Sequence, residues 1–321
     1  MIIYHLISIT LAVIIDCFIG DPSRWPHPVR WMGNFIALLD RHLNQGKYKK
    51  GKGIVLLLLV TTTVLVINLL VSWGAYEFHY IMGIIVEACL IATTISQKDL
   101  KTAALRVYKP LTDGDIEDAR YQVSMIVGRD TEELDENEII RATVETVAES
   151  IGDGITSSLF WAFIGGAPLA MMYRAVNTCD SMIGHKNEHY HVFGWASAKF
   201  DDVLNWIPSR ITSFLMMLTN RVQYLKRKEA IKCWRVDAQK HPSPNSGFFE
   251  AAVALLLGIQ LGGINYYNGL KSDRARMGIS RRSLEKKDIL HTIKIMQRAI
   301  FSFVIILWTG GGIIGIASAW F

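Results

Sequence analysis

Three carboxylates, Glu145, Glu149 and Asp153, recur every four residues in the stretch ENEIIRATVETVAESIGD. Asp135 and Glu138 have the spacing of a capping box, which predicts that a helix starts there and runs to about Asp153. Residues four apart share a helix face, so these carboxylates would form a stripe. A stripe of this kind favours a Mg²⁺ site, since Mg²⁺ takes a few carboxylates together with substrate phosphates; a solvated helix face is the alternative. The small residues flanking the stripe indicate a closely packed neighbour.

A second polar cluster follows an uncharged apolar run. Asp180 lies beside a helical face that carries Arg174 and Asn177, and the D-D-x-x-N spacing puts Asp201 and Asp202 near Asn205. Carboxylates that bind Mg²⁺, with cations that neutralise phosphate charge, are what a site for a metal-bound polyphosphate needs. A structural ion-pair network is the alternative. The candidate phosphate- or substrate-binding residues in this region are Arg174, Asn177, Ser181, Lys186, Lys199, Asn205 and Arg210.

A proline-rich loop, GDPSRWPHPVR, comes earlier in the chain. Its prolines hold the preceding residues extended, so a set of polar side chains stands on a stiff backbone. Such a loop suits ligand binding; the alternative is a rigid linker whose tryptophans anchor at a membrane interface. The polar residues of the loop are Asp21, Arg24, His27 and Arg30.

Long uncharged runs indicate an integral membrane protein. Half of the residues are hydrophobic, the mean hydropathy is +0.24, and the runs 54–73 and 299–321 contain no charge. Each run is long enough to cross a hydrocarbon core of roughly 30 Å as a helix. Two weaker spans, 2–19 and 78–97, each carry one carboxylate.

The basic loops predict the orientation. Lys and Arg flank the hairpin formed by the second and third spans and are abundant in 271–298, so both regions should be cytoplasmic. The net charge of +5 is then mainly this positive-inside signal plus contact with anionic lipid, and nucleic acid is not an expected partner.

Three further apolar segments, 155–173, 203–218 and 247–267, leave the number of spans open. If all three crossed, the basic loop 271–298 would lie outside, so at least one should be a buried or re-entrant helix. Gly165, Gly166 and Pro168 break the first segment, and Pro208 with Arg210 interrupts the second, which suits half-helices that line a cavity.

We therefore predict an all-α fold: a polytopic helical membrane protein with at least four spans, broken or re-entrant helices and a polar site facing the cytoplasm. The whole chain, 1–321, would be a single membrane-embedded domain. Its expected parts are N-terminal spans (1–97), cytoplasmic helices (98–154), active-site helices (155–220), basic cytoplasmic and membrane-associated segments (221–298) and a last span (299–321).

Two classes of function fit these residues. One is a Mg²⁺-dependent membrane enzyme that acts on a phosphorylated substrate, such as an intramembrane prenyl or phosphate transferase. The other is a small-molecule transporter whose broken helices form the substrate site. A transporter should show repeat symmetry between its halves, and none is visible, so the enzyme is favoured.

Long polar blocks carry a resemblance to a known family. These blocks are GDPSRWPHPVRWMGNFI at 20–36, the stretch 129–212 with NTCDSMIGHKNEHYHVFGWASAKFDDVLNWIPSR at its end, and HPSPNSG at 241–247. In this order they resemble the CobD/CbiB family of cobalamin biosynthesis, the adenosylcobinamide-phosphate synthases. The segment after about Gly269 is only generically similar.

The resemblance implies an enzyme of the inner membrane that joins a carboxylate of adenosylcobyric acid to the amine of (R)-1-amino-2-propanol or its O-phosphate. A carboxylate is a poor electrophile, so the family is taken to consume ATP with Mg²⁺, and an acyl phosphate is the natural intermediate. The implied surroundings are the lipid bilayer and other membrane-bound enzymes of nucleotide-loop assembly.

For this chemistry we assign hypothetical roles. Mg²⁺ would bind Glu145, Glu149 and Asp153, or Asp180, Asp201 and Asp202. The cations Arg174, Lys186 and Lys199 would hold phosphates, which Asn177 and Asn205 would orient. The proline-rich loop would close the mouth of the site, and His27 or His185 is the candidate base for the incoming ammonium. The catalytic set is thus His27, Glu145, Glu149, Asp180 and His185. The HPSPNSG loop would offer backbone N–H groups to an anion or form an ordinary helix N-cap.

Overall fold

The structure is a computed structural model that describes residues 2–22 and 26–319, with side chains through residue 313. It is mostly helical, at 73%, as predicted. The chain divides into two compact units: unit 1 comprises 1–96, 153–205 and 304–321, and unit 2 comprises 97–152 and 206–303. Whether both work as the single membrane-embedded domain expected from the sequence stays a prediction.

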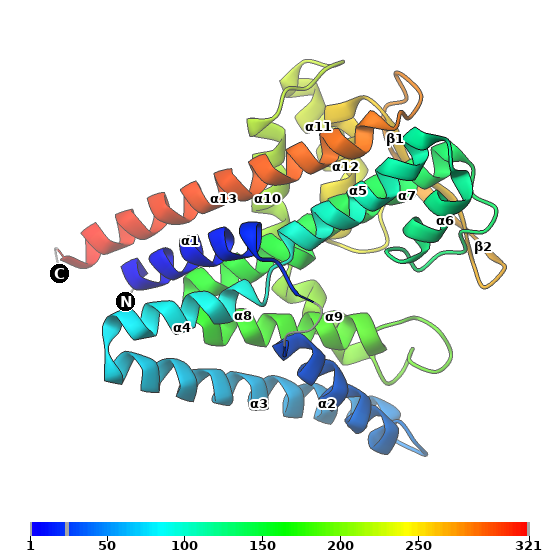
Figure 1. The fold of residues 1–321 in the computed structure, drawn as a ribbon. Helices are drawn as coiled ribbons and strands as arrows, with labels where there is room; N and C mark the ends of the chain where they lie inside the picture. The colour runs from blue at the N-terminus through cyan, green and yellow to red at the C-terminus, as the bar shows by residue number, and fades with distance from the viewer. Residues whose placement is uncertain (1, 23–25, 320–321) are drawn as a thin grey trace. The chain divides into compact units, whose positions relative to one another are not determined.

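Unit 1 is a bundle of helices. The α3–α4 pair turns back at His79, and α8 packs against both of these helices (Figure 1). Apolar side chains of α2, α3 and α8, among them Ile36, Leu56 and Tyr173, form its buried core. The helices are α1 (Ile2–Phe18), α2 (Pro28–Leu43), α3 (Lys49–Phe78), α4 (Tyr80–Ala92), α8 (Ser157–Ile183) and α9 (Trp195–Leu204), with the end of α13 (Lys287–Ala319).

Unit 2 is built around α12, which packs on α7, α10, α11 and a β-hairpin. Nearly every residue of α12 is buried, which explains why its sequence is apolar on all sides. The elements are α5 (Gln97–Asp113), α6 (Ile116–Ser124), α7 (Glu136–Ile151), α10 (Trp206–Thr219), α11 (Arg227–Asp237), η2 (Ala238–Lys240), α12 (Ser246–Leu257), β1 (Gln260–Tyr267), β2 (Leu270–Gly278) and the first part of α13.

Four helical stretches are long and apolar enough to cross a membrane: Lys49–Phe78, Tyr80–Asp113, Glu136–Ile183 and Lys287–Ile313. They are consistent with a membrane protein, and three of them overlap the predicted spans 54–73, 78–97 and 299–321. The predicted first span forms α1, an apolar helix of 17 residues that is shorter than these four. The segment 155–173, left ambiguous by the sequence, belongs instead to the third stretch.

The segment 247–267 is not one helix, which corrects the all-α prediction in one place. Gly258 ends α12 in the left-handed conformation, with φ of +67°, and the chain then enters β1. Asn268 and Gly269 both have positive φ, as a two-residue hairpin turn between twisted strands requires. The result is a two-stranded antiparallel sheet.

Helix α8 is broken at Gly165 and Gly166, as predicted. Gly166 has φ of +66°, which disfavours residues with a side chain, and the second half of the helix starts at Ala167. The Ala167 N–H donates to the fully buried carboxylate of Glu87 at 3.0 Å. His5, Ser8 and Tyr76 complete the hydrogen bonds of this carboxylate, which offset the unfavourable burial of a charge.

The break in 203–218 lies at Asn205 rather than at Pro208 and Arg210. Asn205 separates α9 from α10, and Pro208 falls in the first turn of α10. Proline is tolerated there because the first N–H groups of a helix have no intrahelical acceptor.

Candidate functional site

The polar cluster of unit 1 centres on Asp201 of α9. Its Oδ1 accepts a hydrogen bond from Asn177 Nδ2 at 3.2 Å, and its Oδ2 accepts one from Asn205 Nδ2 at 2.9 Å. Asn177 comes from the second half of α8, so the broken helix and α9 together build the cluster. The side chain of Asp201 is 7% exposed. Both asparagines thus hold the carboxylate, and their predicted contact with phosphate stays a prediction.

A buried layer fixes Asn205 in turn. Its Oδ1 accepts from Ser157 Oγ at 2.5 Å and from Tyr173 Oη at 2.8 Å. With its carbonyl oxygen occupied by two hydroxyls, the amide can present only its NH₂ group to Asp201. Asn205, which orients Asp201, is therefore itself fixed by hydrogen bonds from Ser157 and Tyr173.

Arg174 supplies the positive charge of this cluster. Its Nη1 donates to the Asp153 carbonyl oxygen at 3.3 Å and to Asn177 Oδ1 at 3.2 Å. Its Nε is buried and has no hydrogen-bond partner among the described residues. A partly buried guanidinium with spare donor capacity suits an anion such as a phosphate.

Electrostatics make Asp201 unusual. The pKa of its carboxyl is raised to about 7, chiefly by burial and next by the nearby Asp180 carboxylate; Asp202 also raises it, while the hydrogen bonds from Asn177 and Asn205 lower it. At neutral pH the group is thus divided between its acid and its carboxylate form. A bound cation would favour the carboxylate.

The donor set fits Mg²⁺ only together with a substrate. Among the described residues, no group of three or more His, Cys, Asp and Glu is arranged to hold a metal ion. Mg²⁺ commonly uses one or two carboxylates plus substrate phosphates, and Asp201 with its neighbour Asp180 meets that need. The arrangement therefore suits a metal that arrives with a polyphosphate.

Other predicted residues of unit 1 lie at its surface or in separate pairs. Ser181, His185 and Lys186 are exposed at and after the end of α8. Lys199 Nζ pairs with Asp202 Oδ2 at 3.3 Å. In the proline-rich loop, His27 Nε2 lies 2.9 Å from Asp21 Oδ1, and Arg30 is exposed. Arg24 lies outside the described residues.

Glu145, by contrast, belongs to unit 2 and is 3% exposed there. Its Oε2 accepts from Arg129 Nη2 at 2.6 Å, and its Oε1 accepts from the Gly262 N–H at 2.8 Å. Arg141 donates to the Gly262 carbonyl oxygen at 2.5 Å. These contacts tie α7 to β1 and confirm that the acidic stripe faces a packed neighbour.

The acidic stripe does not continue to Asp153. The capping box at Asp135 and Glu138 is present as predicted, but α7 ends at Ile151 and a π-helical turn, η1 (Gly152–Thr156), follows. Asp153 belongs to unit 1, where its carbonyl oxygen meets Arg174. The three carboxylates are therefore divided between the units.

The HPSPNSG loop and Arg210 form a network of structural contacts in unit 2. Asn245 is the N-cap residue of α12, but its side chain makes no capping hydrogen bond; instead Ser243 Oγ accepts from the N–H groups of Asn245 and Ser246, each at 3.2 Å. Ser246 Oγ donates to Glu149 Oε1 at 2.7 Å. Arg210 lies over the ring of Phe248 and donates to Asn245 Oδ1.

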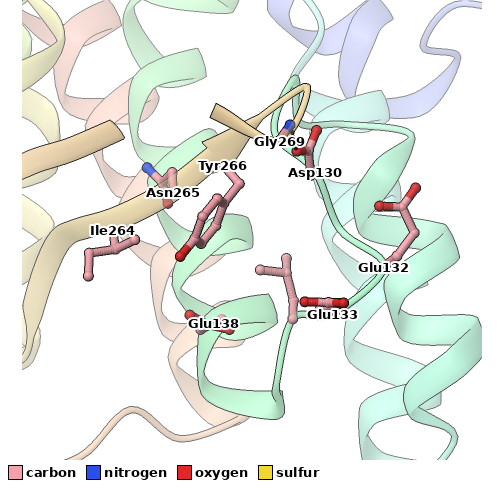
Figure 2. Close-up of a pocket in the computed structure, with 9 residues that line it drawn as sticks. Asp130, Glu132, Glu133, Glu138, Ile264, Asn265, Tyr266 and Gly269 are labelled. Atoms are coloured by element: carbon pink, nitrogen blue, oxygen red, sulfur yellow. Dashed lines mark hydrogen bonds between the residues drawn. The ribbon is translucent and has the colours of Figure 1, made fainter. Parts of the chain in front are cut away.

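A pocket of about 380 Å³ in unit 2 is lined by none of the predicted site residues (Figure 2). It is strongly acidic, so it repels a polyphosphate. Two of its carboxylates have structural partners: Asp130 accepts from the N–H groups at the hairpin turn, and Glu138 completes the capping box. Its lining residues are Asp130, Glu132, Glu133, Leu134, Glu138, Ile264, Asn265, Tyr266 and Gly269.

Sequence reasoning missed several residues of these clusters. Tyr173 precedes Asn177 by four residues on the same helix, so the sequence could have predicted that it lies on the same helix face as Asn177. Ser157 carries no such signal, because only the folded chain brings it to Asn205. Arg129 and Asn265 of unit 2, hydrogen-bonded to each other at 2.8 Å, were missed for the same reason.

Fold and site together define a polytopic helical membrane protein with a buried carboxylate–amide–arginine cluster. The chain matches the family described as CobD/Cbib protein over residues 9–296, and it belongs to that family. The membership supports a role in cobalamin biosynthesis.

The chain is similar to curated relatives along nearly its whole length. "Cobalamin biosynthesis protein CobD" of Halalkalibacterium halodurans is 51% identical over 319 residues, covering 98% of this chain and 99% of that protein. The protein of the same name from Clostridium perfringens is 43% identical, covering 92% and 95%. "Cobalamin biosynthesis protein CbiB" of Salmonella typhi is 41% identical, covering 89% and 91%. No solved structure matches the chain.

Proposed function

We propose that this protein is an ATP-dependent amide ligase of cobalamin biosynthesis. It joins the free carboxylate of adenosylcobyric acid to the amine of (R)-1-amino-2-propanol or its O-phosphate, and the product is adenosylcobinamide or its phosphate. Family membership supports the pathway. The observation that carries the proposal is the unit 1 cluster, where the Arg174 guanidinium with its unpartnered Nε accompanies the buried Asp201 carboxyl.

The reaction needs activation of a carboxylate. Its oxygen attacks the terminal phosphorus of ATP, which gives an acyl phosphate and ADP. The neutral amine then attacks the acyl carbon, the C–N bond forms, the C–O bond to phosphate breaks, and inorganic phosphate and one proton leave. Charge builds on phosphate oxygens in the first step, so a preorganised cation and donors are the groups required.

Different residues of the chain would bind the phosphates, bind the metal ion and remove the proton. Arg174 would hold phosphate oxygens through its spare donor capacity, while Asn177 and Asn205 keep Asp201 oriented toward the same region. Mg²⁺, when bound, would neutralise phosphate charge, with Asp201 and Asp180 as the carboxylates that we assign to it. Lys186 and Lys199 are further phosphate-binding candidates, and His27 or His185 is the base that would remove the ammonium proton.

The location of the reaction is part of the proposal. We place the protein in the inner membrane with the site facing the cytoplasm, where ATP is present. The unit 2 residues Glu145 and Glu149 remain alternative metal ligands, although Arg129 and Gly262 already occupy both oxygens of Glu145.

The test is condensation by the purified full-length protein in lipid nanodiscs. Adenosylcobyric acid, (R)-1-amino-2-propanol O-phosphate and Mg²⁺ are incubated with and without ATP, and the corrinoid is weighed by mass spectrometry. We expect the mass of the amide only with ATP, and a rate lower by roughly 10²–10³ in Asp201→Asn, as found for loss of a preorganised polar group.

The matched control is Asp113→Asn, the same change at an exposed residue of unit 2. It should keep full activity and unfold at a temperature near that of the parent. Asp201→Asn turns an NH₂ group toward the donors of Asn177 or Asn205, so it should unfold at a lower temperature and is assayed where it remains folded. Absence of product with ATP, together with a co-purified prenyl diphosphate, would refute the ligase and favour a prenyl transferase.

A further inference from the structure

A basic pocket of about 240 Å³ lies at the start of α13 in unit 2. Lys294, Ile295 and Arg298 come from α13, where residues three and four apart share a face. The end of α10 contributes Asn220 with Arg221 just after it. None of these residues belongs to the candidate site described above.

The pocket has an excess of positive charge. No Asp or Glu is among its lining residues. Within the part of the chain that the structure describes, Arg221, Lys294 and Arg298 form no ion pair with a carboxylate, and Arg298 donates only to Asn220 Oδ1, at 3.3 Å. Cations that converge without a counter-charge repel one another unless an anion joins them.

Apolar side chains form the rest of the lining. Leu256 and Leu257 come from the last turn of α12, and with Ile295 they are buried. Arg298 is the last charged residue before the uncharged run that begins at Ala299, so the pocket lies where α13 would leave water for hydrocarbon. A ligand that matches both linings is an anion with an apolar tail.

We propose that this pocket binds the phosphate of an anionic phospholipid, with the proximal part of the acyl chains on the leucines. Basic pockets at the cytoplasmic ends of membrane helices bind acidic headgroups in this way. The site is independent of the ligase proposal, because that proposal assigns no role to any of its residues. Free phosphate has the same charged group, but the apolar side of the pocket favours the lipid.

The test measures lipid binding by the full-length protein in neutral detergent. Phosphatidylglycerol and phosphatidylcholine are titrated separately, and retained lipid is counted by native mass spectrometry, with inorganic phosphate or ATP as competitor. We expect saturable binding of one phosphatidylglycerol molecule per protein. It should be retained in preference to phosphatidylcholine and should not be displaced by millimolar phosphate. The double variant Lys294→Gln/Arg298→Gln should bind it at least about tenfold more weakly, at about 1 kcal/mol for each basic side chain.

The matched control is Lys228→Gln/Lys232→Gln on α11, which removes the same charge from exposed positions outside the pocket. It should bind lipid as the parent does. Equal weakening in both double variants would overturn the proposal, since it would indicate only general electrostatic attraction. Displacement by phosphate or ATP without lipid selectivity would also overturn it. So would a variant that loses thermal stability but keeps its lipid affinity, because the cations would then serve only the carboxyl end of α10.

Discussion

Asp201 is a carboxyl whose surroundings oppose each other. Asn177 and Asn205 donate to its two oxygens, which favours the carboxylate, but burial and Asp180 favour the acid and dominate, so its pKa is about 7. Because a Mg²⁺ ion beside the carboxyl would favour its charged form, metal binding and deprotonation should be linked.

The first prediction concerns pH and Mg²⁺. The folded pKa of Asp201 lies above the unfolded one, so its stabilising contribution is complete below about pH 4 and is lost as pH rises through about 7. Without Mg²⁺, the protein should therefore lose stability between pH 5 and pH 7, by at most about 1.4 kcal/mol per pH unit from this group. Thermal unfolding in detergent at pH 5 and pH 7, with and without Mg²⁺ plus ATP, measures this change in stability.

Asp201→Asn is the control for this pH effect, because it removes the titrating group and keeps the shape. The slope between pH 5 and pH 7 should flatten, and the stabilisation by Mg²⁺ and ATP at pH 7 should disappear. Equal slopes in parent and variant would show that other groups govern the pH dependence.

At the scale of elements, the broken helix α8 determines where the site residues lie. Its second half begins at Ala167, held by Glu87, and carries Tyr173, Arg174 and Asn177 into the cluster. The direction of this half-helix is therefore set outside the site.

Gly166→Ala tests that dependence. A Cβ at this position would lie 2.0 Å from Glu87 Oε1, and its φ of +66° is strained for alanine. We expect a loss of about 1–3 kcal/mol of stability for the backbone alone, and a loss of activity as the half-helix moves. Unfolding in detergent and the condensation assay measure both effects.

Gly74→Ala in α3 is the matched control, because its Cβ would meet nothing within 4 Å and its helical backbone accepts alanine. It should be as stable as the parent or more so, by up to about 1 kcal/mol. If Gly166→Ala behaves in the same way, the break is not what positions the site.

Ser243 gives a second prediction at this scale, for α12. Its hydroxyl accepts from two N–H groups at the start of that helix, so Ser243→Ala should lower the free energy of unfolding by about 1 kcal/mol. Denaturant unfolding measures the loss. The exposed Ser283→Ala should change little, and an equal loss there would show that the two hydrogen bonds to Ser243 do not stabilise the start of α12.

Some of these elements could be predicted from the sequence, and others could not. The capping box and the Gly165–Gly166 break involve residues that are close in the chain, so both could be predicted from the sequence. The Asn268–Gly269 turn was equally local, but the apolar run before it concealed the hairpin. The cluster around Asn205 was only partly predictable, since Tyr173 and Ser157 reach it from 32 and 48 residues away.

At the scale of the whole molecule, the long apolar helices are consistent with a membrane protein, but only charge indicates its orientation. The loop 271–298 is rich in Lys and Arg, so it should be cytoplasmic. Lys271→Cys in a variant without the natural cysteines should react with an impermeant maleimide in inside-out vesicles and not in intact cells. Labelling from the outside would require a different number of crossings.

The carboxylate of Glu87 has a consequence for biogenesis. Glu87 lies in α4 and its partners come from α1, α3 and α8; the last of them, Ala167, is synthesised 80 residues after it. Until α8 arrives, this acidic group is without one of its donors in an apolar setting, and the Ala167 N–H that begins the second half of α8 is without its acceptor. The bend in α8 must therefore form late, after the earlier helices have assembled, so that completion of the site reports that the bundle around Glu87 has been correctly put together.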